Sequence, residues 1–368
     1  MGLLRILLAI CVLCSHSTPI AHLKWLPGDT AVEIFFVISG FYIQLVFHEK
    51  YNYEKLGKNW IKNFYIARYI RLYPTYIIAV LVTLFYNLTA FLTHRAIDPI
   101  STWYQIINLH NNINNFALQF FIAFTNIFIF FQDVTMFLGI YDETAYFTDN
   151  FRTSSIPIWK VLAVPQAWSL GIELTFYFLA PFLLKMKNFR LFLVASTLLL
   201  IKGLFLLTTG LQDPWTYRFF PFELPWFFAG ALAYRKMGKI IELKNTVLRG
   251  FQLDIVHTYL LVIVVSVCSL ADKVFIRFIY PLAFVFIIPL LFSVTSRNKN
   301  DRALGELSYP FYIFHFLILN IAGYLFKGRF VAVLSLVITL FFTHYIVKFE
   351  KAWIEPVRQK LSNETLRR

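Results

Sequence analysis

An arginine and a histidine share one face of the first apolar segment. Arg5 and His16 stand eleven residues apart in a run with few other polar side chains. Eleven residues are close to three helical turns, so both side chains would project from one face, about 16 Å apart along the axis. Histidine exchanges a proton near neutral pH, and arginine binds phosphate. A snorkelling arginine and a locally hydrogen-bonded histidine are the alternative explanation.

A carboxylate opens the second apolar segment. Glu33 precedes an apolar run that ends with Ser39 and Gly40. If this segment returns from the side where the first one ended, Glu33 starts at a depth similar to that of His16. A carboxylate beside an imidazole fixes its tautomer and stabilises its protonated form. Ser39 and Gly40 are more typical of close helix packing than of a nucleophile.

Two arginines stand at the start of the third apolar segment. Arg68 and Arg71 are three residues apart, a spacing that puts both on one helix face. Two converging guanidinium groups would suit phosphate recognition. Anchoring of a cytoplasmic helix end by basic residues is the alternative.

Two more polar groups lie within apolar segments. Ser169 and Glu173 share a helix face that follows Trp168. A carboxyl group inside a membrane is neutral, paired or functional, so Glu173 is a candidate for a site-supporting role, with a structural pair as the alternative. Tyr309 and His315 lie in a later apolar segment, where packing explains them as readily as substrate contact.

The elements that must position these residues belong to a membrane protein. The 368-residue chain is 58% hydrophobic and 15% charged, whereas soluble domains are about a quarter charged. Lys and Arg (34) outnumber Asp and Glu (20), but most lie in short loops between apolar segments, as cytoplasmic loops of membrane proteins do. Membrane lipids are therefore expected partners, and nucleic acid is not.

Ten apolar segments approach the length of about 20 residues that crosses a bilayer. The basic loops between them place both termini in the cytoplasm. Another apolar stretch, 116–138, contains Asn126, Gln132 and Asp133 and would break this parity, so we expect it to be re-entrant or interfacial. The expected spans are 3–20, 30–48, 70–92, 168–186, 190–209, 217–235, 254–271, 276–296, 305–325 and 329–347.

The predicted fold is therefore an all-α polytopic bundle of about ten transmembrane helices plus one re-entrant or interfacial helix. We expect a single integral-membrane domain over residues 1–356 and a short cytoplasmic tail over 357–368. The first apolar run lacks a typical cleavage site, so we expect a retained helix and not a signal peptide.

Five segments, in this order, resemble the integral-membrane acyltransferase family 3, which O-acylates lipopolysaccharide, exopolysaccharide and related glycans. Each segment alone is weak evidence, but five in the family's order are specific. Relatives often have Asp where this chain has Glu33, and some carry an esterase-like C-terminal domain, which we do not expect for this chain. The matching segments are Arg5 with His16, Glu33 to Phe41, Arg68 to Pro74, Trp168 to Tyr177 and Gly305 to His315.

The resemblance implies an O-acyltransferase, with acetyl as the expected group and acetyl-CoA as the donor substrate. The implied acceptor is a carbohydrate or lipid-linked glycan, such as lipopolysaccharide O-antigen or exopolysaccharide, and the implied location is the inner membrane of a bacterium. His16, oriented by Glu33, would be the general base, and Arg5, Arg68 and Arg71 would hold the phosphates of acyl-CoA. The expected site-supporting residues are Trp168, Ser169, Glu173, Tyr309 and His315.

Other functions stay open at this stage. A transporter or flippase of a glycan or lipid-linked intermediate would also be a basic protein with many spans, and a membrane scaffold is a more distant alternative. An acyl-histidine intermediate is an alternative to direct transfer. No Cys and His grouping has the spacing of a zinc site, so no metal is expected.

Overall fold

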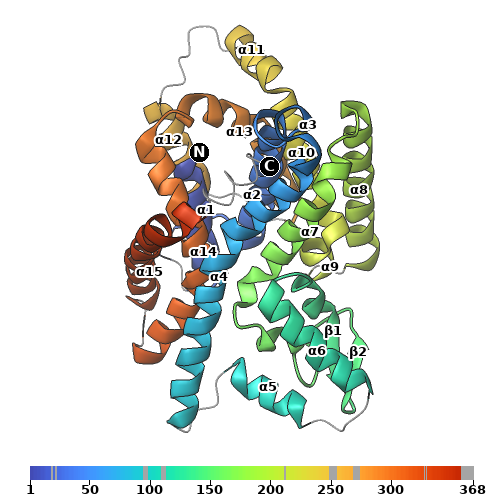
Figure 1. The fold of residues 1–368 in the computed structure, drawn as a ribbon, viewed down its shortest axis with the longest axis vertical. Helices are drawn as coiled ribbons and strands as arrows, with labels where there is room; N and C mark the ends of the chain where they lie inside the picture. Colours follow the sequence, from blue (N-terminus) through green and yellow to red (C-terminus); the bar gives the residue numbers. More distant parts are fainter. Residues whose placement is uncertain are drawn as a thin grey trace. The chain divides into compact units, whose positions relative to one another are not determined.

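The computed structural model describes residues 1–17, 20, 23–93, 98–108, 113–210, 213–247, 255–267, 274–326, 328 and 330–357. Most of the expected tail, residues 358–368, lies outside this range. Helices dominate the described chain (Figure 1), and six helical stretches within it are long and apolar enough to cross a membrane. The prediction of a helical membrane protein is confirmed, and the number of about ten spans stays a prediction.

Long helices form most of the chain, joined by shorter ones. The long helices are α2 (Gly28–Glu49), α4 (Trp60–Leu92), α8 (Asn188–Thr209), α13 (Val274–Thr295), α14 (Lys299–Leu325) and α15 (Phe330–Phe349). The shorter helices include α1 (Gly2–Ser15), α6 (Ile113–Phe128), α7 (Trp168–Leu183), α10 (Phe220–Arg235), α11 (Met237–Val247) and α12 (Ile255–Val267). The smallest are α3 (Tyr53–Leu56), α5 (Ile100–Ile107) and α9 (Trp215–Arg218).

Two helices begin earlier than the apolar pattern predicts. Helix α4 starts at Trp60 and not near residue 70, and α14 starts at Lys299 and not near residue 305. Apolarity marks only the part of a helix that lipid surrounds, while the polar turn before it stays helical when it is capped. For α14 the cap is Asn298, whose side-chain oxygen accepts the Asp301 N–H at 3.0 Å.

The chain forms two compact units. The first unit comprises Met1–Ala67, Ala180–Ala195 and Pro225–Arg368, and the second comprises Arg68–Leu179 and Ser196–Leu224.

In the first unit, α1 packs along α14 in a parallel direction. At the N-terminal end, a Cβ added to Gly2 would lie 1.5 Å from the Asp301 carbonyl oxygen, so only glycine allows this approach. At the other end, the ring of His16, which follows α1, contacts His315 and Phe316 of α14. The two helices therefore run side by side over the whole length of α1.

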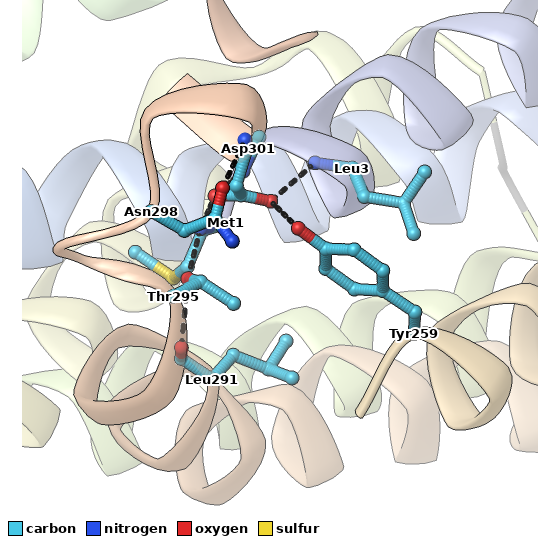
Figure 2. A network of polar contacts seen from close by, with 8 residues as sticks. Met1, Leu3, Tyr259, Leu291, Thr295, Asn298 and Asp301 are labelled. Carbon is cyan, nitrogen blue, oxygen red and sulfur yellow. Dashed lines mark hydrogen bonds and ion pairs between the residues drawn. The ribbon is translucent and has the colours of Figure 1, made fainter. Parts of the chain in front are cut away.

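The carboxylate of Asp301 caps the start of α1. It accepts the N–H groups of Gly2 at 2.6 Å and Leu3 at 3.0 Å, together with the Tyr259 hydroxyl at 3.2 Å. Figure 2 shows Leu3 and Tyr259 on the carboxylate. The Met1 ammonium also donates to this carboxylate. The first N–H groups of a helix have no partner within it, and its dipole favours a negative charge there. Asp301 thus fixes the register of α1 on α14.

Helices α2 and α10 approach each other through two glycines. A Cβ on Gly40 would lie 2.0 Å from the Phe227 carbonyl oxygen, and a Cβ on Gly230 would lie 1.9 Å from the Val37 carbonyl oxygen. Both obstacles are backbone atoms, which cannot turn aside as a flexible side chain can. The prediction that Gly40 serves close helix packing is confirmed.

We expect Gly40→Ala to lower the melting temperature of the purified protein in detergent, because the added methyl group pushes α2 away from α10. Forced overpacking of this kind costs about 1–3 kcal/mol. The matched control is Gly203→Ala on α8, where a Cβ would meet nothing within 4 Å. That control should be neutral or slightly stabilising, because alanine favours a helix over glycine. Equal effects of the two substitutions would contradict the packing role of Gly40.

In the second unit, the apolar stretch 116–138 does not form one helix. Helix α6 has 16 residues, fewer than the ~20 that span a bilayer, and Ile129 and Phe131 then take positive φ angles of 71° and 64°. The chain continues into a 3₁₀ turn, Asp133–Phe137, and an antiparallel hairpin of β1 (Leu138–Tyr141) and β2 (Thr144–Phe147). The all-α prediction missed this hairpin, whose turn residues also take positive φ although neither is glycine.

The segment around α5, α6 and the hairpin has a small core of its own. Its buried members are all aliphatic and come from α5, α6, β1 and the turn 158–161. They are Ile106, Leu118, Ile122, Ile140, Ile158 and Val161. This core holds the interrupted segment in place beside the later part of the same unit.

Candidate active site

The pairing of α1 with α14 brings four candidate residues onto two adjacent helices. Arg5 lies against α14, since its Nη1 is 3.5 Å from the position of a Cβ on Gly305. His16, eleven residues later, contacts His315 on the same helix. Arg5 and His16 therefore both project toward α14, which confirms that they share one helix face. Tyr309 belongs to α14 between these two contact points.

His16 stands where α1 ends. It caps the helix, and its side chain is exposed. Its ring centroid lies 5.6 Å from that of His315, with 29° between the ring planes, and 5.4 Å from that of Phe316, which it meets edge-on. An exposed imidazole at a helix end, held by rings from the neighbouring helix, is accessible for proton exchange.

His315 is completely buried, and its hydrogen bond to the backbone of its own helix indicates which ring nitrogen carries a hydrogen. Nδ1 lies 2.7 Å from the Tyr312 carbonyl oxygen. A carbonyl oxygen can only accept, so Nδ1 carries a hydrogen. Complete burial favours the neutral ring, in which Nε2 then carries a lone pair. Nε2 has no hydrogen-bond partner within the described chain. The buried ring therefore presents an unused acceptor.

Glu33 lies on a helix that touches both α1 and α14. At the start of α2, a Cβ on Gly28 would be 2.9 Å from the Ser15 hydroxyl oxygen. Two turns further on, the ring of Phe35 packs against Tyr312, with centroids 6.2 Å apart. Glu33 lies between these contact points along α2 and is buried, with 7% of its surface exposed. This placement agrees with a carboxylate near the histidine end of α1.

Arg68 and Arg71 belong to the second unit and differ in their surroundings. Both lie on α4, but Arg68 is buried and Arg71 is exposed. The expectation that both arginines bind the phosphates of one ligand therefore stays a prediction.

The residues predicted around Trp168 are largely engaged within the second unit. Trp168 is buried at the start of α7, where its ring lies 4.4 Å from the Arg218 guanidinium carbon and 4.7 Å from the Tyr217 ring centroid. Ser169 Oγ donates to the Gln166 carbonyl oxygen at 3.2 Å. The Tyr177 hydroxyl donates to the Glu173 carboxylate, one turn away. Glu173 is thus paired.

Asp133 is a buried carboxyl group outside the predicted site residues. Its Oδ1 lies 2.9 Å from the position of a Cβ on Gly171, in the middle of the Trp168 to Tyr177 segment. Burial raises the pKa of Asp133 to about 7. The sequence signal was a lone carboxylate after more than thirty residues without a charged side chain.

Lys202 and Glu223 form a second missed feature, a buried ion pair. Lys202 Nζ lies 2.9 Å from Glu223 Oε1, and the two side chains are 1% and 0% exposed. They come from α8 and α10 within the second unit. Each is a lone charge inside an apolar segment, and such charges are expected to find each other or to serve function.

Comparisons with known proteins place all these residues within one family region. A family model described as an acyltransferase domain matches residues 1–347. An uncharacterized protein of Aquifex aeolicus (strain VF5) is 29% identical over 225 residues, which cover 57% of this chain and 95% of that relative. No solved structure matches the chain. The matched region includes every candidate residue from Arg5 to His315.

Proposed function

Because this chain belongs to the integral-membrane acyltransferase family 3, we propose that it transfers an acetyl group from acetyl-CoA to a hydroxyl of a cell-surface glycan. The family match over residues 1–347 supports acyl transfer as the type of reaction. The matched region includes both α1 and α14, the two helices that position the candidate residues. The acceptor would be a polysaccharide such as lipopolysaccharide O-antigen or exopolysaccharide, free or linked to a lipid.

His16 would act as the general base. A sugar hydroxyl is a weak acid near neutral pH, so it attacks efficiently only if its proton is removed as the new bond forms. The hydroxyl oxygen would attack the thioester carbonyl carbon while His16 takes the proton. The carbon–sulfur bond then breaks, and the leaving thiolate of CoA receives that proton. The products are the O-acetylated glycan and CoA.

Glu33 would stabilise His16 in its protonated form. A buried carboxylate close to an imidazole favours the imidazolium that develops in the transition state. Its position on α2, between the Gly28 contact with α1 and the Phe35 contact with α14, supports this role.

The donor would enter from the end of α1 that carries Arg5. Arg5 and His16 are about 16 Å apart along the axis, so phosphates bound near Arg5 would leave the long pantetheine arm to reach His16. We place the Arg5 end at the cytoplasmic face of a bacterial inner membrane, with both termini inside. The acceptor would then meet the thioester nearer the outer face.

The parallel direction of α1 and α14 supports the ten-span arrangement. Helices that cross in the same direction must be separated by an odd number of crossings. Seven expected spans lie between them, from 30–48 to 276–296. An eighth crossing by residues 116–138 would reverse α14 relative to α1. The early end of α6 at Phe128 also supports a re-entrant or interfacial position for that stretch.

We expect Arg68→Ala and Arg71→Ala each to raise the KM for acetyl-CoA by about 10- to 100-fold, with little change in the KM for the glycan. Loss of one charge-assisted hydrogen bond to phosphate costs about 1.5–3 kcal/mol, and ~1.4 kcal/mol is a factor of ten. The measurement is the initial rate of labelled acetyl transfer as acetyl-CoA is varied. Lys62→Ala, an exposed cation on the same helix, is the matched control. An unchanged KM in both arginine variants would assign them to membrane anchoring alone.

The remaining family residues would support the acceptor side of the site. They are Trp168, Ser169, Glu173, Tyr309 and His315. The described contacts of Trp168, Ser169, Glu173 and His315 hold these four side chains in fixed positions, which suits residues that shape a site.

The direct test is mass spectrometry of surface polysaccharide from cells with and without the gene. We expect acetyl esters to disappear without the gene and to return on complementation. Loss of a larger acyl group would refute acetyl as the donor group, and unchanged acylation would refute the proposed function.

A further inference from the structure

We propose that His315 is a positioning residue for His16, and that its Nε2 accepts the hydrogen bond that fixes the His16 tautomer. The inference rests on the proposed function, in which His16 is the base. Two groups would then act on His16. Glu33 would stabilise its protonated form with a negative charge, and His315 would accept a hydrogen bond from it.

Packing alone does not account for an imidazole at position 315. The ring is completely buried, and Nε2 meets no hydrogen-bond partner within the described residues. A buried acceptor without a partner destabilises the folded state. Phenylalanine would fill similar space without that cost, so the retained lone pair points to a role in activity.

The hydrogen bond to Tyr312 decides which nitrogen is the acceptor. Nδ1 donates to the Tyr312 carbonyl oxygen at 2.7 Å, which holds the ring in one orientation and leaves the lone pair on Nε2. The hydrogen bond fixes the ring before substrate binds, and complete burial favours its neutral form.

The distance to His16 suits a bond between the two rings. Their centroids are 5.6 Å apart and their planes are 29° from parallel. An N–H···N bond between two imidazoles, with nitrogens ~3 Å apart, separates the centroids by roughly 5 Å. His16 is exposed at the end of α1, so its side chain has room to turn an N–H toward His315 Nε2. Phe316, which meets the His16 ring edge-on, limits rotation from another side.

This bond would give His16 the arrangement that a base needs. One ring nitrogen of a catalytic histidine donates to an orienting acceptor, which leaves the lone pair of the other nitrogen for the substrate proton. When His16 takes that proton, its N–H toward His315 becomes a stronger donor. A neutral His315 adds no positive charge to oppose this step.

The test compares His315→Phe with His315→Gln in the purified protein. Phenylalanine keeps the ring and removes the acceptor, whereas the glutamine side-chain oxygen can accept near the position of Nε2. The assay uses labelled acetyl-CoA and unacylated glycan, which is extracted from cells that lack the gene. We expect His315→Phe to lower kcat by about 10- to 100-fold, to leave the KM for acetyl-CoA within about twofold, and to keep or raise the melting temperature. His315→Gln should recover a measurable part of kcat.

Two controls distinguish a failure of this inference from a failure of the proposed function, in which His16 is the base. His344→Phe makes the same substitution at an exposed histidine of α15, outside the site, and it should reduce kcat by no more than about threefold. Wild-type kcat in His315→Phe overturns the inference, as does a lowered melting temperature with no recovery in His315→Gln, which would assign His315 to packing. If His16→Ala is fully active in the same assay, the proposed base fails, whatever the His315 variants do.

Discussion

His16→Ala is expected to lower acyl transfer by at least two orders of magnitude and to leave the protein inserted and folded. A general base contributes typically 10²–10⁴-fold, and alanine has no group that can replace it. The fold should survive, because His16 stands at the end of α1 with an exposed side chain. The measurement is the initial rate of labelled acetyl transfer, corrected for the amount of protein in the membrane.

The matched control is a histidine of similar exposure outside the site. His344 lies on α15 and is exposed, so His344→Ala should keep the wild-type rate. Comparable melting temperatures for both variants would show that the loss in His16→Ala is chemical. Robust transfer by His16→Ala would remove the proposed mechanism.

Lys202→Met is expected to destabilise the protein by about 3–5 kcal/mol, because it leaves the buried Glu223 carboxylate without its ammonium partner. Both side chains are almost fully buried and lie 2.9 Å apart, so the remaining charge has little access to water. The measurements are the melting temperature in detergent and the yield of folded protein in membranes.

The double variant Lys202→Met with Glu223→Leu distinguishes the contribution of the ion pair from the cost of burying one charge without its partner. When both charges are removed, the penalty for an isolated buried charge disappears, and replacement of a buried ion pair by apolar residues is often neutral or stabilising. We therefore expect the double variant to regain most of the stability lost in the single one. A single variant as stable as the wild type would contradict a stabilising ion pair, and so would a double variant no better than the single one.

Features set by local spacing could be predicted from the sequence. The common face of Arg5 and His16 follows from helical periodicity, and both residues do contact α14. The packing role of Gly40 also follows from its type and position. Glu173 was expected to be paired or functional, and its partner Tyr177 is one helical turn away.

Features that depend on distant segments could not be predicted. His315 is 299 residues from His16 in the sequence, and periodicity within one helix does not reveal which helix packs beside it. Lys202 and Glu223 lie in different apolar segments for the same reason. The hairpin 138–147 was missed because its strands are short and its turn has no glycine.

The most direct test of the account follows the acetyl group itself. Membranes that contain the wild-type protein, the His16→Ala variant or neither would be incubated with acetyl-CoA labelled in the acetyl group and with unacylated glycan from cells lacking the gene. The account predicts label in the glycan, with one CoA thiol released per acetyl group, only with the wild-type protein. Glycan movement across the membrane without release of CoA, or equal labelling with the His16→Ala variant, would contradict it.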